Sequence, residues 1–360
     1  MTEKYFAAAN SSGGFVSWFD DIFAPDGIDR TYIIKGGSGT GKSTLMKRIA
    51  SRGCEDGWQC EYFYCSSDPS SLDGILLRSS DGRSLAVLDG TAPHTRDPRY
   101  PGAAEEIINL GEYWDSDQLR AHRDEITALC MKKSSCFAAA YEYLYAAGEL
   151  NRLIRSETAR YLLTDKMGRA AERLLVQAMH ESHMRPSPGE KPKIAIRAVS
   201  ALSTDGAVHF DTYAQLPGRV VAVNDLYGSA PFFFDALIDV GQRLGLSMVR
   251  APSPLEPSLT EALRFPELSL SVVTAEGELP DDLRLVNMAR FLDRDALRQS
   301  GDRIRRRILT RTVRELTDGA LAKLSEVRTI HAQVEKIYIA AMDFTFVDCF
   351  VSDLTSRLFH

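Results

Sequence analysis

Residues 36–43 read GGSGTGKS, and their types and spacing suit the binding of a phosphate chain. They satisfy the pattern G-x-x-x-x-G-K-[ST] of a phosphate-binding loop. Glycines let the backbone turn its N–H groups inward around a phosphate, at angles that cost other residues energy. The ammonium of Lys42 would meet the β- and γ-phosphates, and the hydroxyl of Ser43 would ligate Mg²⁺ at a helix start. The residues expected to bind the nucleotide are Gly36, Gly37, Ser38, Gly39, Thr40, Gly41, Lys42, Ser43 and Thr44.

Asp89 is the candidate for the carboxylate that such a loop needs to hold the metal. It ends the apolar run in SLAVLDGTAPH, which predicts a buried strand. Ligands gather at the carboxyl ends of strands in open α/β sheets. An aspartate after a strand is a weak signal by itself, because many turns begin with one. With the loop before it, we expect Ser43 and Asp89 to hold Mg²⁺.

Three residues are candidates for the chemical step. Asp68 and Asp73 lie in CSSDPSSLD (65–73), after a strand that reaches the same edge, and either carboxylate could orient water or an acceptor hydroxyl. His94 follows Asp89 closely and could sense the γ-phosphate or move a proton near neutral pH. The alternatives are that Asp68 caps a turn or helix beside Pro69 and that His94 is a surface loop residue.

The elements that must position these residues are a strand before the loop, TYIIK, and a helix after it, STLMKRIASRG. Further apolar strands, CEYFYC and SLAVLDG, alternate with helical segments. Such alternation predicts an α/β fold of the P-loop NTPase type, with a parallel sheet and helices on both faces. Residues 102–184 and 281–358 lack strand signals and show helical spacing. We expect each to form a helical subdomain appended to its own sheet.

The chain repeats itself. INLGEYWDSDQLR (108–120) recurs without a gap as VNMARFLDRDALR (286–298), and the segments before each copy follow the same order of strands and helices. This predicts a tandem duplication, with domains at 1–185 and 194–360 joined by a proline-rich linker at 186–193. The polar residues that recur suggest helix capping and packing rather than catalysis. They are Asn109, Asp115, Asp117 and Arg120, which recur as Asn287, Asp293, Asp295 and Arg298.

The second copy has lost the loop. Its counterpart reads NDLYGSAPFF, where only Gly228 remains of the glycines and Pro231 and Phe232 stand near the places of Lys42 and Ser43. Proline removes a backbone donor. Thr274 replaces the metal aspartate, so the second half is not expected to bind a triphosphate in this way.

An inactive copy could still complete the first site with an arginine that stabilises charge on the phosphoryl group. The arginine-rich stretch GDRIRRRILTRTVR (301–314) offers candidates, as do Arg219 and Arg250 beside second-half strands. The alternative is a solvated basic helix face. The two halves would then form an intramolecular pseudo-dimer.

Composition narrows the classes further. The chain has 360 residues, a hydrophobic share of 44%, a charged share of 26% and a net charge of −6, which argues against nucleic acid or an anionic membrane as partner. We expect no membrane span, since no apolar run approaches ~20 residues, and no signal peptide. The six cysteines form no CxxC pair, which fits reduced thiols in cytoplasm and no zinc ribbon.

With these motifs assembled, the chain resembles a family of uncharacterised bacterial P-loop ATPases built from two tandem nucleotide-binding-type domains. The resemblance covers almost the whole chain. It rests on GGFVSWFD, IIKGGSGTGKSTLMK, YCSSDPSSLDG, LAVLDGTAPH, INLGEYWDSDQLR and IHAQVEKIYIAAMDF. It implies ATP binding but no physiological substrate. Some relatives carry a loop in both halves, and this sequence departs from them at 225–232.

Three functions remain open from the sequence. The first is a Mg²⁺-dependent ATPase or nucleotide-driven switch with one site in the first half. The second is a kinase that transfers the γ-phosphoryl group to a nucleotide or other small molecule, with 102–184 as a lid that excludes water. The third is a regulatory or scaffold protein that binds nucleotide without turnover and presents its helices to a protein partner. ATP is the expected nucleotide, because the chain has no [NT]KxD motif after the loop.

Overall fold

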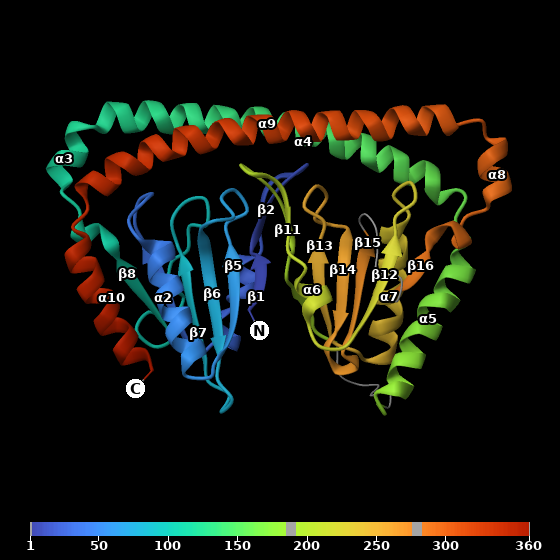
Figure 1. Ribbon diagram of the computed structural model, residues 1–360, viewed down its shortest axis with the longest axis horizontal. Coiled ribbons are helices and arrows are strands. Elements are labelled where there is room, and N and C mark those ends of the chain that lie inside the picture. The colour runs from blue at the N-terminus through green and yellow to red at the C-terminus, as the bar shows by residue number, and fades with distance from the viewer. Residues whose placement is uncertain (1, 185–191, 276–282, 360) are drawn as a thin grey trace.

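The computed structural model describes residues 2–184, 192–275 and 283–359. It shows an α/β protein with two halves, each a mixed sheet of mostly parallel strands flanked by helices (Figure 1). The predicted linker at 186–193 falls mostly outside the described residues, as do positions 281 and 282 of the second helical stretch.

The first half contains a six-stranded sheet with the order β1-β5-β6-β7-β4-β8. β6 runs antiparallel to both neighbours, whereas the other pairs are parallel. The prediction of a parallel sheet was therefore wrong at β6. The reason is connection length, since the short turn between β6 and β7 cannot make the long crossover that parallel neighbours need. The strands are β1 (Glu3–Phe6), β4 (Arg30–Lys35), β5 (Gln59–Tyr64), β6 (Leu72–Arg78), β7 (Ser84–Asp89) and β8 (Glu105–Asn109).

The second sheet repeats this plan strand for strand, in the order β9-β13-β14-β15-β12-β16, with β14 as the antiparallel member. A two-stranded hairpin and a short helix recur as well, so the two halves contain the same elements in the same order. The strands are β9 (Ile194–Ile196), β12 (Arg219–Asn224), β13 (Met248–Pro252), β14 (Thr260–Phe265), β15 (Leu270–Ala275) and β16 (Arg284–Asn287). The hairpins and short helices are β2 (Ala8–Ser11), β3 (Gly14–Ser17), α1 (Phe19–Ile22), β10 (Ser200–Ser203), β11 (Gly206–His209) and α6 (Thr212–Gln215).

Most predicted elements lie where the sequence placed them. The loop leads into α2 (Lys42–Glu55), and its counterpart leads into α7 (Ala230–Leu244). The two segments predicted to lack strands contain one each, β8 and β16. Both are edge strands with mixed exposure, so neither carries the continuous apolar run of a central strand.

The long helices cross from one half to the other (Figure 1). After the short α3 (Ser116–Ala121), α4 (Arg123–Ala159) runs from the first half to the second, where α5 (Thr164–Glu181) packs on α7. After α8 (Arg294–Gln299), α9 (Arg303–Ala341) returns beside α4, and α10 (Phe344–Leu358) packs on α2. A helix of 37 residues is about 55 Å long, which exceeds the width of one small domain.

The predicted attachment of each helical stretch to its own sheet was therefore wrong. In sequence α5 belongs to 1–185 and α10 to 194–360, but each packs on the other half. Met167 and Leu174 of α5 share a core with Phe233 of α7, and Val347 and Val351 of α10 share one with residues of α2. Each half is therefore built from segments that are not contiguous in sequence, because α4 and α9 take the chain from one half to the other.

Long helices cover one face of each sheet only. The inner faces of the two sheets share a single core, in which Phe23 and Phe63 of the first half meet Tyr213 and Ala251 of the second. On these faces the helices are the short α1 and α6, so helices flank both faces as predicted, although the two faces are covered unequally. Among the described residues, no helix combines the length and the apolar character that a membrane span requires.

Candidate functional site

The phosphate-binding pattern folds as a tight loop between β4 and α2. Gly39 and Gly41 have φ angles of +71° and +92°, which residues with a side chain rarely adopt. The hydroxyl of Thr40 donates to the carbonyl of Gly37 at 2.9 Å and holds the loop from inside. Two of the glycines in the pattern are therefore required by the positive φ angles of the backbone at positions 39 and 41.

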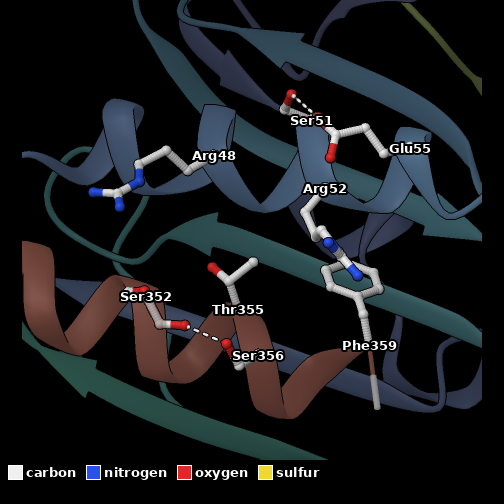
Figure 2. Close-up of a pocket in the computed structure, with 8 residues that line it drawn as sticks. All are labelled: Arg48, Ser51, Arg52, Glu55, Ser352, Thr355, Ser356 and Phe359. Carbon is white, nitrogen blue, oxygen red and sulfur yellow. Dashed lines mark hydrogen bonds between the residues drawn. The ribbon is translucent and has the colours of Figure 1, made fainter.

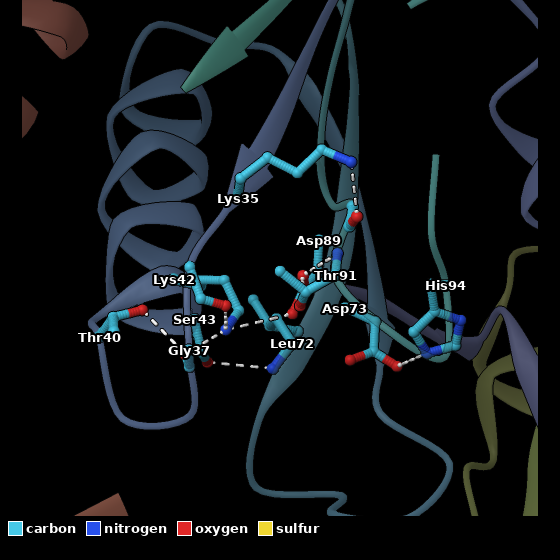
Figure 3. A network of polar contacts seen from close by, with 12 residues as sticks. Lys35, Gly37, Thr40, Lys42, Ser43, Leu72, Asp73, Asp89, Thr91 and His94 are labelled. Atoms are coloured by element: carbon cyan, nitrogen blue, oxygen red, sulfur yellow. Dashed lines mark hydrogen bonds and ion pairs between the residues drawn. The ribbon is translucent and has the colours of Figure 1, made fainter. Parts of the chain in front are cut away.

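Lys42 opens α2 and turns back over the loop (Figure 3). Its Nζ donates to the carbonyls of Gly36 at 3.0 Å and Gly37 at 2.6 Å, and it lies 3.6 Å from Oδ2 of Asp89. The side chains of Lys42 and Asp89 are only 12% and 14% exposed. A cation held by carbonyl dipoles beside one carboxylate is suited to receive a further anion.

Asp89 reaches this point because β7 lies next to β4, with Ile34 and Asp89 in register. Its Oδ1 accepts the backbone N–H of Thr91 at 2.9 Å and also the Thr91 hydroxyl. Burial raises the pKa of Asp89, and Lys42 and Thr91 offset part of that rise. The carboxylate is thus positioned and partly desolvated at the edge where the loop opens.

Ser43 lies one residue into α2, and its hydroxyl oxygen accepts the N–H of Leu72 at 3.0 Å. Ser43 and Asp89 supply the hard oxygen donors that Mg²⁺ prefers. Among the described residues, no group of three or more His, Cys, Asp and Glu side chains is arranged to hold a metal. This donor set fits Mg²⁺ that is bound together with phosphate oxygens and water, and does not fit a metal held by protein ligands alone.

Asp73 and His94 form a buried pair beside Asp89 (Figure 3). β6 starts at this edge, so its antiparallel direction brings Asp73 to the site from a strand that the sequence did not predict. Nε2 of His94 lies 3.1 Å from Oδ2 of Asp73, and their side chains are 5% and 9% exposed. The imidazole stacks on Phe19, with centroids 4.2 Å apart, and its Nδ1 has no hydrogen-bond partner among the residues that the structure describes. His94 is therefore not a surface loop residue.

Asp68 lies apart from this pair, in the turn before β6. Its Oδ1 accepts the N–H of Ser70 at 3.2 Å and the Ser70 hydroxyl at 2.7 Å. This is the turn-capping geometry that was the alternative interpretation of Asp68. Ser38 and Thr44 also lie on the loop and the first turn of α2, with Thr44 exposed.

The far end of α9 covers the loop, which brings a segment from late in the chain to the site. A Cβ built on Gly37 would lie 2.5 Å from the ring of Tyr338. One built on Gly39 would lie 2.9 Å from Ile339 and 3.2 Å from the carbonyl oxygen of Glu335. The glycines at these two positions thus also make room for a helix.

Sequence reasoning missed these α9 residues. The segment IHAQVEKIYIAAMDF (330–344) was noted only as part of the resemblance. His331, Glu335 and Tyr338 follow a spacing of four and three, which places them on one helix face. That spacing was a readable signal for a polar and aromatic face, although nothing in it shows that the face meets the loop.

In the second half, side chains of the protein itself occupy the position that corresponds to the phosphate-binding loop. The carboxylate of Asp225 accepts the N–H of Ala230 at 2.8 Å and the N–H of Gly228 at 3.2 Å. Thr158 of α4 donates its hydroxyl to the carbonyl of Tyr227 at 2.9 Å. A carboxylate of the chain therefore occupies the helix N-terminus that a phosphate would use in the first half.

The second-half arginines have partners away from the first loop. Arg219 pairs with Glu181 at 2.7 Å, and Arg250 donates to backbone carbonyls of the turn between β13 and β14. Arg306 is buried against the ring of Tyr227, beside the degenerate loop. The N-terminal part of α9 thus lies at the opposite end from the candidate site, and these contacts give no support to an arginine supplied from 301–314.

The repeated stretch caps helices, as predicted. The side chain of Asp115 accepts N–H groups at the start of α3, and that of Asp293 accepts the N–H of Ala296 in α8. Each stretch also holds the end of a crossing helix, through the isolated bridges Trp114–Met342 and Leu162–Leu292. The repetition therefore marks the two points where long helices dock.

The predicted lid is not in place over the loop, because α5 packs on the second sheet. A kinase mechanism that depends on residues 102–184 closing over the nucleotide loses its structural basis. The parts of 102–184 that lie near the loop include Leu110, whose Cβ is 3.3 Å from a Cβ built on Gly36, and the first part of α4, which passes beside the end of α9 (Figure 1).

Two cavities lie elsewhere. One, of about 350 Å³, lies between α2 and α10 and is lined by Arg48 and Arg52 (Figure 2). Arg48 pairs with Asp348, and Arg52 pairs with Asp56. The other, of about 450 Å³, lies between the halves, where Arg197 pairs with Glu61 at 2.7 Å. These ion pairs satisfy the charges within the protein.

Comparison of the chain with models of protein families, with curated proteins and with solved structures found no match in any of the three. The functional argument therefore depends on the geometry of the site.

Proposed function

We propose that the first half binds a nucleoside triphosphate with Mg²⁺ at residues 36–44 and hydrolyses its γ-phosphate, with ATP as the expected nucleotide. The observation that carries this proposal is the convergence of Lys42, Ser43 and Asp89 at one edge of the sheet, on a loop with two left-handed glycines. A glycine turn with a purely structural role would not require a buried lysine and a buried carboxylate at its mouth.

Each residue has a specific role in this proposal. The loop N–H groups would surround the β-phosphate, and the Nζ of Lys42 would exchange the carbonyls of Gly36 and Gly37 for phosphate oxygens. Ser43 and Asp89 would hold Mg²⁺, which supplies positive charge that neutralises the phosphates. The second half would have a structural or regulatory part.

In the hydrolytic step, a water oxygen forms a bond to the γ-phosphorus, and the bond to the bridging oxygen breaks. The electron pair leaves with ADP, and the water proton passes to a base. Asp73 is the candidate base, because its carboxylate lies beside Asp89. His94 would act as a positioning residue that orients Asp73 through its Nε2.

The test is nucleotide binding and phosphate release with ATP and GTP in the presence of Mg²⁺. Lys42→Ala should lose both, whereas Lys47→Ala, which changes an exposed lysine of the same helix, should lose neither. Asp73→Asn should keep binding and slow release about 10²–10⁴-fold. Binding and release that persist in Lys42→Ala would refute the proposal.

A second candidate is a nucleotide-binding switch without turnover. The packing of α9 on Gly37 and Gly39 favours it, since a bound triphosphate would act next to a helix that reaches the other half. Tight binding of ATP that depends on Lys42, together with negligible phosphate release, would support this candidate over the hydrolase. Release accelerated by a small-molecule acceptor would point to a kinase.

A further inference from the structure

His331 lies on the face of α9 that meets the loop, one helical turn before Glu335. Its Nε2 is 3.6 Å from Oε1 of Glu335, and its side chain is 32% exposed. Burial lowers the pKa of His331, and the charges of Lys133 and Lys42 lower it further, against the opposing effect of Glu335 and Asp68. The imidazole therefore lies within the field of two lysines from two other helices.

Lys133 comes from α4, which runs beside α9 at this level. The packing of Cys136 against Val327 and Ile330 places position 133 opposite position 331. Lys133 is half-buried, and within the described part of the chain it forms no ion pair or hydrogen bond. Asp89 partners Lys42, but Lys133 has no such anion. Lys42 is thus paired with Asp89 and His331 with Glu335, so Lys133 is the one of the three residues without an ion pair in the described part of the chain.

In the second half, the equivalent contact between a long helix and a turn is held by an ion pair. The turn 68–70 reads Asp-Pro-Ser, and its equivalent at 256–258 reads Glu-Pro-Ser. Both of the oxygens of Glu256 accept from Arg155 of α4, and Oε1 also accepts from Asn151 at 2.7 Å. The carboxylate is 5% exposed, so the helix and the turn are joined by a buried, fully paired contact.

In the first half the equivalent positions on α9 carry different charges. Glu335 and Arg155 lie equally far before the residues that bridge to the repeated stretches, Met342 and Leu162, and so do His331 and Asn151. Glu335 is therefore the counterpart of Arg155. The turn that it faces carries the carboxylate of Asp68, the counterpart of Glu256. Among the described residues, the first half lacks the ion pair that joins helix and turn in the second half, and Lys133 of the neighbouring helix has no ion pair.

We propose that Lys133 and His331 complete the phosphate site and contact the terminal phosphate of a triphosphate bound at Lys42. This inference rests on the proposed function and adds two residues, from α4 and α9, to it. A triphosphate supplies the anion that Lys133 lacks, and an N–H of the His331 imidazole can donate a hydrogen bond to the same phosphate. A diphosphate is shorter and does not reach Lys133 and His331, so the two residues distinguish ATP from ADP.

The experiment measures affinity for β,γ-imido-ATP and for ADP, both with Mg²⁺, by calorimetry. Lys133→Met and His331→Gln should each weaken the triphosphate analogue about tenfold and change ADP by less than about twofold. The matched controls are Lys132→Met, an exposed lysine on the same helix, and His180→Gln, an exposed histidine on α5. These should change neither affinity. Urea midpoints of all four variants establish that they are folded.

The outcomes separate the two proposals. Equal weakening of both nucleotides, or no weakening of either, would overturn the roles of Lys133 and His331 while leaving the site at Lys42 intact. A native chain that binds neither nucleotide would overturn the proposed function itself. If His331→Gln fails to fold, Lys133→Met decides, because methionine keeps most of the length of the lysine stem.

Discussion

Replacing Gly37 with alanine would place a methyl carbon 2.5 Å from Cε1 and 2.7 Å from Cδ1 of the Tyr338 ring. Both distances are far below ordinary carbon contacts of about 3.5–4.0 Å. The ring has little room to retreat, because Trp114 lies against it with centroids 5.9 Å apart. Overpacking of this kind costs about 1–3 kcal/mol. We expect Gly37→Ala to destabilise the protein by that amount in the absence of nucleotide.

The ring of Tyr338 is the proposed cause, so its removal should abolish the cost. Tyr338→Ala loses the burial of the ring, but in that background Gly37→Ala should add little. The coupling energy between the two substitutions is expected to be about 1–3 kcal/mol. Urea unfolding of the native chain, the two single variants and the double variant measures it. Gly27→Ala is the control, because a Cβ there meets nothing within 4 Å.

One result would refute the reasoning. If Gly37→Ala costs the same with and without the Tyr338 ring, the loss comes from the loop alone, and α9 does not lie on the loop in solution. The crossing of the long helices would then lack its most specific support.

Three further predictions concern stability. Arg155→Ala should cost about 3–5 kcal/mol in urea unfolding, because it leaves the buried carboxylate of Glu256 unpaired, and Arg155→Met combined with Glu256→Gln should cost much less. Burial acts to raise the pKa of Glu105, but hydrogen bonds from the N–H groups of residues 99 and 100 and the charge of Arg96 hold it below the ordinary 4.5. The folded state then binds fewer protons, so this stability is complete above about pH 4.5 and lost as pH falls through the folded value; Glu105→Gln should flatten that acid-side loss. A fragment ending at residue 184 lacks α10, whose three buried apolar side chains each contribute about 1.5–3 kcal/mol, and it should show no cooperative thermal transition in calorimetry. A cooperative fragment would contradict the exchange of helices.

The sequence was most informative where structure is local. Positions 36–43 had one strong interpretation, because glycine torsions, the lysine and the hydroxyl act within one turn. Apolar runs located three strands of the first half correctly, and Asp89 followed from the end of one of them. The capping role of Asp115 and Asp293 was also readable, since a cap bonds to N–H groups two or three residues away.

The sequence was least informative about contacts between segments that are far apart along the chain. β6 is almost wholly buried, but its run LDGILLR was not recognised, so the antiparallel member of the sheet was missed. The pairing of Asp73 with His94 depends on that strand. The docking of α9 on the loop depends on a helix that begins in the other half, and neither spacing nor composition distinguishes a helix that crosses from one that folds back.

The exchange of helices explains why a copy without a functional loop would still be required. α10 lies in the sequence of the second half, yet its side chains fill the core beneath α2, the helix that begins with Lys42. α9 reaches the loop only because the second half anchors its other end, where Arg306 is buried against Tyr161 and Tyr227. The carboxylate of Asp225 satisfies the second helix N-terminus without any ligand. The second half can therefore lack the phosphate-binding pattern, but it cannot be removed without taking away part of the core on which the candidate site is built.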